Sequence, residues 1–360
     1  MSNYEIISNK QGKQAILDTQ IGKRITKWWN NIYAYPYNHE YYLIQNKDKQ
    51  YAIFHISNLQ RPITQWWPVI YIDGLIRGES DYYVVQNQDG QYAIFHKDNP
   101  YEPISQWWNQ IKQPMFVTGI SDYYIAQNQD GEEAIFHKDN PNEPITQWWK
   151  EIKADELVTK QSNYYIAVDQ DGKMAVFHID NPYTPITLWW DEITLYKSLV
   201  ENSDYYIAKN QSKEAIFHKD NPNEPISNWW TDVILAGLWK GKSEYYVVEQ
   251  NGQMAIFHKD NPNEPISQWW DWIIPDGLIM GESDYYIVQR EDFQHAIFHK
   301  DNADKPISQW WKYIHLHGLL IGESEYYIVQ DDVKKRLSSI KITQINQSAN
   351  GGIKYIKKAY

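Results

Sequence analysis

Short apolar and polar runs follow one another along this chain in an order that returns about every 41 residues. The clearest markers of the return are pairs of tyrosines, which begin at Tyr41, Tyr82, Tyr123, Tyr164, Tyr205, Tyr245, Tyr285 and Tyr326. A fixed period of this length indicates a tandem array, in which each unit buries its apolar face against its neighbours. The segment from Tyr4, NYEIISNKQGKQAIL, is a weaker copy of the same unit. We therefore divide the chain into an atypical first unit at 1–40, seven tandem repeats at 41–325, and a partial ninth unit with a basic tail at 326–360.

Each unit begins with a predicted β-hairpin. In YYVVQNQDGQYAIFH, from Tyr82 to His96, two β-rich runs flank a polar turn that ends in Asp89-Gly90. An Asx-Gly dipeptide between apolar runs is a strong hairpin signal, because glycine accepts a positive φ without steric cost. The next segment, DNPNEP in its commonest form, contains two prolines that lack backbone donors. We predict that this segment is a loop.

A pair of tryptophans follows the loop, and its surroundings indicate a helical turn. Serine or threonine stands two residues before each pair, as a helix N-cap would, and an aliphatic residue stands four residues after the first tryptophan. In a helical turn these side chains lie on one side, whereas in a strand the two rings would point to opposite faces. We therefore predict a short helical turn whose rings pack in the core. The predicted core positions in three of the repeats are Trp107, Trp108, Ile111, Trp148, Trp149, Ile152, Trp269, Trp270 and Ile273.

The last segment of each unit completes the predicted fold. GLIRGES before Asp81 and GLIMGES before Asp284 are short apolar runs between glycines, which we interpret as a third strand. The fold class is then an all-β tandem-repeat array. An open β-superhelix is favoured because the first unit lacks the proline loop and the ninth is incomplete, as caps would be. The alternative is an eight-bladed β-propeller, in which a split last blade closes the ring.

The units resemble the WG-repeat (KWG-type) proteins of bacteria. The matching residues are YYVVQNQDGQYAIFHKDN and the following PIS segment, and the resemblance covers most of the chain. The Trp-Gly dipeptide of that family is replaced by Xaa-Ala, as in Tyr92-Ala93 and Glu133-Ala134, and the units are longer. The resemblance implies a modular binding protein and no particular reaction.

Charge and composition narrow the classes of partner. A net charge of −12 with 22% charged residues argues against a nucleic-acid binder, which needs a basic track along the phosphates. No apolar run approaches the roughly 20 residues of a membrane span. The first residues lack the pattern of a secretory signal, so we expect a cytoplasmic protein or one exported by a leaderless route. There are no cysteines, which removes disulfides and thiolate metal sites.

Repetition argues against a single active site, because almost every polar residue is written many times with equal neighbours. Histidines recur at His55, His96, His137, His178, His218, His258 and His299, but no second ligand is fixed beside each. The acidic proline loop lacks the ligand spacing of an EF-hand. We therefore predict no enzyme activity, no cofactor and no metal.

Three functions remain open at this point. The first is a non-catalytic, multivalent scaffold that binds another protein through a repeated face, and the second is a multivalent lectin that uses aromatic rings. The third is a self-assembling structural or appendage protein, joined through the C-terminal tail. That tail, from Val333 to Tyr360, holds seven Lys or Arg and no Asp or Glu, and we expect its strand-like segments to pair with an open edge of the first unit or of a neighbouring molecule. The candidate binding residues lie in the repeated loop: Asn99, Glu102, Asn142, Glu143, Pro222, Asn223, Glu224, Asn263 and Glu264.

Overall fold

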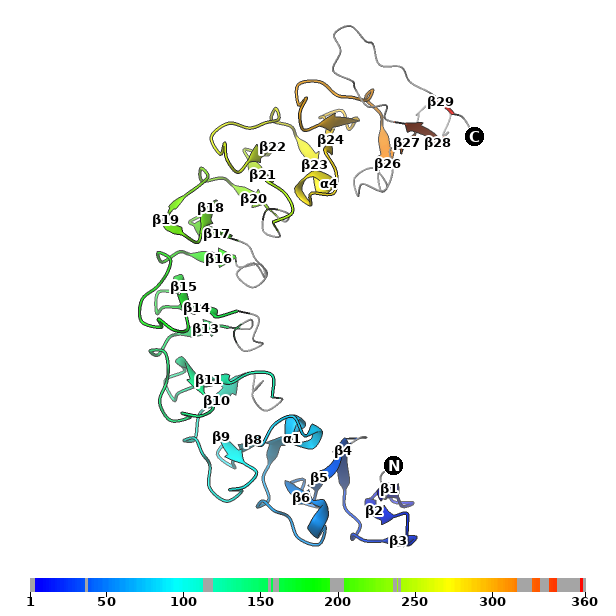
Figure 1. Cartoon of the computed structure of the whole chain (residues 1–360), viewed down its shortest axis with the longest axis vertical. Helices are drawn as coiled ribbons and strands as arrows, with labels where there is room; N and C mark the ends of the chain where they lie inside the picture. The colour runs from blue at the N-terminus through cyan, green and yellow to red at the C-terminus, as the bar shows by residue number, and fades with distance from the viewer. Residues whose placement is uncertain are drawn as a thin grey trace. The chain divides into compact units, whose positions relative to one another are not determined.

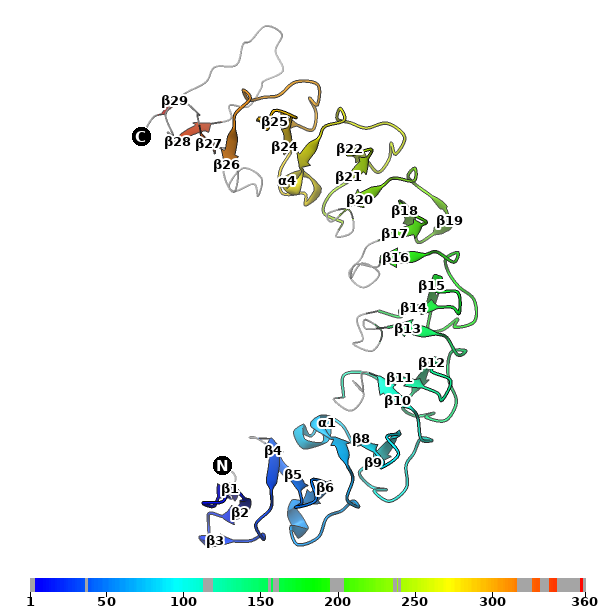
Figure 2. The same ribbon diagram turned by 180° about the vertical axis from the view of Figure 1, so that it is seen from behind.

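A computed structural model describes residues 4–35, 38–112, 119–154, 157, 162–194, 204–235, 238, 241–315, 326–330, 337–341 and 357–358. The chain forms two compact halves, Met1–Ile186 and Thr187–Tyr360. Within each of them, small antiparallel sheets of three or four strands follow one another along the sequence (Figures 1 and 2). The described part of the chain is therefore an all-β repeat with few helices.

Five sheets lie in the first half of the chain, each built from strands consecutive in sequence. Their strands are β1 Tyr4–Ser8, β2 Gln14–Asp18 and β3 Lys23–Arg24; β4 Asn31–Tyr35, β5 Asn38–Gln45 and β6 Tyr51–His55; β7 Val69–Tyr71, β8 Tyr82–Gln86 and β9 Tyr92–His96; β10 Gln110–Lys112, β11 Tyr123–Gln127 and β12 Glu133–His137; and β13 Glu151–Lys153, β14 Tyr164–Val168 and β15 Met174–His178. A short 3-10 helix, η1 Ile56–Asn58, follows β6.

Four sheets lie in the second half of the chain. Their strands are β16 Glu192–Thr194, β17 Tyr205–Asn210, β18 Lys213–His218 and β19 Asn221–Pro225; β20 Asp232–Ile234, β21 Tyr245–Gln250 and β22 Gln253–His258; β23 Trp272–Ile274, β24 Tyr285–Gln289 and β25 His295–His299; and β26 Tyr313–His315, β27 Tyr326–Gln330, β28 Leu337–Lys341 and β29 Lys357–Lys358.

The predicted hairpins are present in all of these sheets. In one of them, β8 pairs with β9 from Tyr82 opposite His96 to Gln86 opposite Tyr92. The Asn87 side-chain oxygen accepts hydrogen bonds from two backbone N–H groups of the turn, both at 2.9 Å. Gly90 completes the turn with φ of 83°, the left-handed conformation for which the Asx-Gly signal selects.

The tryptophan pair does not form the predicted helical turn. The backbone of Trp108 instead runs antiparallel to the start of β9, and each of Trp108 and Tyr92 donates its N–H to the other's carbonyl at 2.8 Å. The Ser105 hydroxyl, read as a helix N-cap, accepts a hydrogen bond from the N–H of Ile94 at 2.9 Å. The serine side chain thus takes the place of a backbone acceptor along an irregular edge segment. The same contact recurs with threonine or serine in most other units.

Helix and third strand exchange the places that the sequence assigned to them. The residues directly after the tryptophan pair form a short strand, β7, whose Ile70 lies opposite Val85 of β8. The glycine-bracketed run that follows forms a helix, α1 Asp73–Arg77, and its equivalent is α4 Asp276–Ile279. Gly78 ends α1 with φ of 75°, so this glycine is a helix C-cap and not a strand boundary.

The core of each half lies between its consecutive sheets, because both faces of the hairpin are buried. Tyr83, Val84 and Val85 are each at most 1% exposed, in line with an apolar run rather than an alternating strand. Tyr83 and Phe95 pack in one cluster with residues of the preceding sheet, where Phe95 contacts Trp67, whereas Val84 and Ile94 pack in one cluster with residues of the following sheet. Within each half, a sheet is therefore stabilised by the sheets before and after it.

Aromatic rings connect the sheets in a repeating order. Trp108, at the edge of the β7–β9 sheet, packs on Phe136 of the next sheet with ring centroids 4.9 Å apart. It also lies 5.8 Å from Trp148, the first tryptophan of the next pair. Trp107 stays with its own sheet, at 6.2 Å from Phe95. One member of each pair thus belongs to its own sheet and the other inserts into the following sheet.

Candidate functional site

The predicted core residues lie where consecutive sheets meet. Five of them are at most 8% exposed: Trp108, Ile111, Trp149, Ile152 and Ile273. The others are half-buried and contact phenylalanines: Trp107 with Phe95, Trp148 with Phe136, Trp269 with Phe257, and Trp270 with Phe298. These rings build the seam between units, and burying aromatic rings is a large stabilising contribution.

All but one of the predicted loop residues are exposed, and one of the exposed residues holds two units together. Asn142 accepts a hydrogen bond from the N–H of Gln106 at 3.0 Å and donates one to the carbonyl of Ile104 at 3.1 Å. Both partners belong to the edge segment of the preceding sheet. Glu143 accepts from the Asn140 amide within its own loop, at 3.0 Å. Asn142 therefore has a structural role that its position in an exposed loop did not indicate.

The remaining loop positions share the exposed setting. They are Asn99, Glu102, Pro222, Asn223, Glu224, Asn263 and Glu264, of which Pro222 is half-buried and the others are exposed. In one unit the loop is the edge strand β19, where prolines are tolerated because one side of the strand has no partner. Most loops share the Asp-Asn-Pro start, and two of them carry an exposed tyrosine, Tyr101 or Tyr183.

A second exposed surface, which the sequence reasoning missed, lies on the short strands. The second residue of each short strand is buried, as Ile70 and Ile273 are at 6% and 2% exposure, except for Ile314, which is half-buried. The flanking residues on the opposite side differ from unit to unit. We call the surface formed by these flanking residues the short-strand face. Its first positions are Asn31, Val69, Gln110, Glu151, Glu192, Asp232, Trp272 and Tyr313, and its third positions include Tyr33, Tyr71, Lys112, Lys153 and Thr194. The third positions Ile234 and Ile274 differ, because they are half-buried and pack against the core.

Large aromatic side chains stand exposed on this face. Tyr33 and Tyr71, on consecutive short strands of the first half, are 46% and 45% exposed. Trp272 and Tyr313, on consecutive short strands of the second half, are 50% and 49% exposed. Surface tyrosines and tryptophans are enriched at protein interfaces, where they supply contact area at low entropic cost.

Two of these tyrosines stand in identical surroundings. The rings of Tyr33 and Tyr51 are 6.4 Å apart and tilted by 43°, and the hydroxyl of Tyr51 accepts a hydrogen bond from the Gln45 amide at 2.9 Å. One repeat later, Tyr71 lies 6.4 Å from Tyr92, whose hydroxyl accepts from the Gln86 amide, also at 2.9 Å.

The same two positions carry charge in the next unit. There, Lys112 and Glu133 replace the two tyrosines and form an ion pair. The face therefore keeps its geometry while its chemistry changes along the array.

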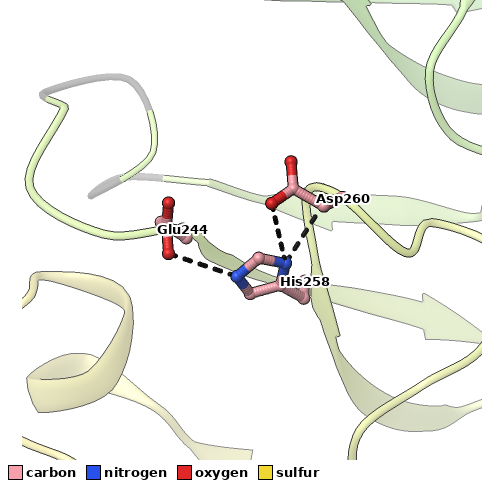
Figure 3. A group of neighbouring side chains, drawn as sticks. All are labelled: Glu244, His258 and Asp260. Atoms are coloured by element: carbon pink, nitrogen blue, oxygen red, sulfur yellow. Dashed lines mark hydrogen bonds and ion pairs between the residues drawn. The ribbon is translucent and has the colours of Figure 1, made fainter.

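A charged cluster occurs beside the histidine of one repeat (Figure 3). His258 Nδ1 accepts a hydrogen bond from the backbone N–H of Asp260 at 3.2 Å, and its Nε2 lies 3.3 Å from a Glu244 carboxylate oxygen. The Lys259 ammonium lies 3.5 Å from the other Glu244 oxygen. The hydrogen bond from His258 and the charge of Lys259 hold the pKa of Glu244 below its ordinary value.

The ligand atoms of this cluster lie within 4.8 Å of one another, but their arrangement fits ion pairing better than metal binding. The Asp260 carboxylate lies on the Nδ1 side of the ring, where the lone pair already accepts the backbone N–H. Glu244 lies on the Nε2 side, and Lys259 already supplies a positive charge to it. In five other repeats the histidine makes the same contact with the following aspartate: His96, His137, His178, His218 and His299. The recurring element is thus a turn cap.

A groove of about 450 Å³ adjoins this cluster in the second half of the chain. It is lined by the turns around Gly241 and Gly281 and by Asp284 and Lys300, which form an ion pair at 2.9 Å. A Cβ on Gly281 would collide with the carbonyl of Lys242, so only glycine allows the two turns to approach this closely. The groove arises from the stacking of consecutive turns and brings together no group of catalytic residues.

The tail forms strands, but their described pairing is local. β28, which contains Ile340 and Lys341, pairs with β27, and β29 pairs with β28. The last sheet thus takes its final strands from its own end of the chain, which differs from the expected pairing with the first unit. Residues 342–356 lie outside the described part.

Among the described residues, no helix has the length and apolar character that crossing a membrane would require. No known protein family matches the sequence, and no characterised protein is significantly similar to it in sequence. The resemblance to WG-repeat proteins therefore stays a prediction.

Several solved structures are distantly similar in shape. A eukaryotic initiation factor is 10% identical over 94% of this chain and 93% of its own, with a TM-score of 0.33. Hsv2 of Kluyveromyces lactis is 12% identical over 96% and 94%, with a TM-score of 0.28. The C-terminal WD40 domain of Sif2 is 10% identical over 88% and 97%, with a TM-score of 0.25. Because these scores lie below those of a shared fold, the repeat architecture rests on the sheets described above.

Proposed function

We propose that this protein is a non-catalytic, multivalent scaffold that binds another protein through the short-strand face. One observation carries the proposal: the second residue of each short strand is always isoleucine or valine and is buried in all but the last of them, while its flanking residues are exposed or half-buried and differ between units. Repeat proteins commonly separate stability from recognition in this way, with a constant core and a variable surface. The exposed Tyr33, Tyr71, Trp272 and Tyr313 would serve as the aromatic anchors of such an interface.

The test compares two sets of exposed tyrosines with the same substitution. Tyr33→Ser with Tyr71→Ser changes the short-strand face, and Tyr101→Ser with Tyr183→Ser changes the proline loops, where the tyrosines are 70% and 66% exposed. Proteins captured from an extract of the source cells by the immobilised full chain would be identified and purified. Their affinities for the wild type and for both variants would then be measured by calorimetry.

We expect the face variant to weaken binding at least tenfold, since an aromatic anchor contributes about 2 kcal/mol or more. The loop variant should bind as the wild type does. Loss of binding only in the loop variant would show that the proline loop is the recognition surface. A chain that captures no protein but binds a glycan through Tyr33 and Tyr71 would be a lectin, and their exposed rings suit that alternative.

We propose further that the units form an open array and not a closed propeller. Two features support this: β1 is the outer strand of its sheet, with no short strand beside it among the described residues, and the last sheet completes itself with β28 and β29. Small-angle X-ray scattering distinguishes the two forms by the maximum dimension of the particle. Deleting residues 348–360 and repeating the measurement at low and high salt would show whether the tail also joins molecules.

A further inference from the structure

The first sheet, β1 to β3, carries a dense group of cations. Residues 4–29 hold five Lys or Arg and two Asp or Glu, whereas residues 41–332 hold 22 Lys or Arg and 43 Asp or Glu. The five cations form no ion pair within the described part of the chain, whereas lysines of later sheets pair with aspartates, as Lys138 does with Asp122 at 2.7 Å. All five are exposed: Lys10, Lys13, Lys23, Arg24 and Lys27.

Four of these cations lie along a single edge of the sheet. β3 pairs with the end of β2, where Lys23 lies opposite Asp18. The chain then follows β2 back to its start, where the backbones of Trp29 and Gln14 exchange hydrogen bonds of 2.8 and 2.9 Å. Because β2 has five residues, this edge is about 17 Å long. We call the surface formed along it by Lys13, Lys23, Arg24 and Lys27 the basic edge.

Two tryptophans hold cations of the basic edge in place. The Arg24 guanidinium lies 4.9 Å from the centre of the Trp28 ring, and the Lys27 ammonium lies 4.1 Å from the centre of the Trp29 ring. Both distances are within the range of cation–π attraction. The aromatic pair of this sheet therefore keeps two positive charges at its edge.

The charge of this edge distinguishes the first sheet from a later one. Thr26 and Ser105 accept hydrogen bonds from equivalent N–H groups of their second hairpin strands, both at 2.9 Å, and this contact aligns the two edges. The β7–β9 sheet has no cation at the positions that correspond to Lys23, Arg24 and Lys27, where it carries Glu102, Pro103 and Gln106. The cations are therefore not required by the fold that the two sheets share.

An apolar side chain stands exposed beside the basic edge. Ile21, in the turn between β2 and β3, is 65% exposed and lies two residues before Lys23. The Asp18 carboxylate accepts hydrogen bonds from the N–H groups of Gln20 and Ile21, at 2.9 and 3.3 Å, and so fixes the shape of the turn. The other carboxylate, Glu5, stands on β1, at the opposite side of the sheet from β3. The surface thus combines cations with an aliphatic side chain on a fixed turn.

We propose that the basic edge and Ile21 bind the surface of a lipid bilayer that contains anionic lipids. Cations are attracted to such headgroups, and an aliphatic side chain beside them gains by entering the boundary of the acyl chains. An acidic protein would match the cations, but a solvated acidic surface would not bury Ile21. The acidic repeats that follow are repelled by the same lipids, and charges beyond about 8 Å are largely screened at physiological ionic strength. Contact is therefore confined to the first sheet.

Flotation of the full chain with vesicles tests the proposal. Vesicles of phosphatidylcholine alone are compared with vesicles of phosphatidylcholine and phosphatidylserine in equal amounts, at low and high salt. The wild type should float only with the anionic vesicles, and high salt should weaken this binding. Each cation contributes about fivefold to the affinity, so Lys23→Gln, Arg24→Gln and Lys27→Gln together should weaken binding about a hundredfold. Ile21→Ser should weaken it about tenfold, through loss of one aliphatic side chain from the lipid boundary.

The control makes the same charge change on exposed lysines of other sheets, with Lys150→Gln, Lys153→Gln and Lys213→Gln, and should float as the wild type does. Circular dichroism verifies that each variant is folded. Ile21→Ser keeps every charge, so it tests the site even if the triple variant of the basic edge does not fold. The short-strand face is unchanged in all of these variants, so the outcome does not depend on the proposed protein partner.

The proposal is overturned if the wild type does not bind anionic vesicles, or if it binds neutral vesicles equally well. Flotation kept by the triple variant of the basic edge would assign lipid binding to another segment, such as the basic tail. Equal loss in the control would mean that only net charge matters. Absence of flotation, together with salt-sensitive oligomers that light scattering detects in the wild type but not in the triple variant, would show that the edge binds a second copy of the chain.

Discussion

Two buried tyrosines in consecutive sheets allow the energetic value of one hydroxyl to be measured. Tyr83 and Tyr124 occupy equivalent positions, both are fully buried, and each stacks on a phenylalanine, with ring centroids 5.5 and 5.3 Å apart and planes tilted by 18° and 15°. The Tyr124 hydroxyl donates to the carbonyl of Pro141 at 2.9 Å. The Tyr83 hydroxyl is buried and has no hydrogen-bond partner among the described residues. Replacing each by phenylalanine therefore removes a satisfied hydroxyl in one case and an unsatisfied one in the other.

The expected effects have opposite signs. A buried hydrogen bond contributes about 0.5 to 1.5 kcal/mol, so Tyr124→Phe should destabilise its sheet by about 1 kcal/mol. Leaving a polar group buried without a partner costs about 1 to 3 kcal/mol, so Tyr83→Phe should be neutral or should stabilise by about 1 kcal/mol. The ring contacts are the same in both variants, and the predicted difference between them is therefore about 1 to 2 kcal/mol.

Native-state hydrogen exchange of β9 and β12 is the suitable assay, since each sheet of a repeat array can open without the others. The free energy of opening should fall in β12 of the Tyr124→Phe variant and should not fall in β9 of the Tyr83→Phe variant. Equal destabilisation in both would refute the reasoning, because it would mean that the Tyr83 hydroxyl forms a hydrogen bond of similar value, for example to an ordered water.

Three further results are expected. Burial raises the pKa most strongly in seven buried tyrosines, that of Tyr42 to about 12, so stability should fall above the unfolded tyrosine pKa of about 10 by up to about 1.4 kcal/mol per pH unit for each ring; tyrosinate absorbance that reaches the value for all 29 tyrosines near pH 10, with the sheets intact by circular dichroism, would contradict this. Phe293, exposed and with φ of 61°, occupies a glycine-like turn position, so Phe293→Gly should raise the melting temperature and Gly131→Ala, at φ of 82°, should lower it, each by about 1 kcal/mol in stability. Asn142→Ala should cost about 1 kcal/mol in urea unfolding, since it removes two hydrogen bonds between units, and a change below about 0.3 kcal/mol would show that water replaces them.

The period, the hairpins and the role of the tryptophans could be predicted from the sequence because each has a local cause. An Asx-Gly turn selects its own geometry, and a pair of indole rings in every unit needs a place in the core. The helical turn was wrong because two structures satisfy the same pattern. A serine before an aromatic pair caps a helix, but in this chain Ser105 accepts from Ile94, a residue of the neighbouring strand that only the fold brings near.

The glycine-bracketed helix had a signal that was read as a strand. Asp73 at its first position and Gly78 after its last are typical of a short helix with a left-handed cap, and Leu75 and Ile76 point one apolar side inward. With so few residues, the period of a helix cannot be told from the alternation of a strand. The decision depends on the strand that precedes it, β7, because once β7 pairs with β8 the chain has to turn back before Tyr82.

The short-strand face was missed because its positions are defined only by the sheet. The sequence pattern predicted that Ile111 is buried, but in a helical turn, where the residues on either side of it do not share one outward face. Once each short strand is placed against its hairpin, the buried residue fixes which neighbours face outward. Substitution at these outward positions then changes the outer surface while the seam between sheets is kept. This separation explains how one unit could be copied so closely in its core and still differ, from repeat to repeat, in the side chains of its outer surface.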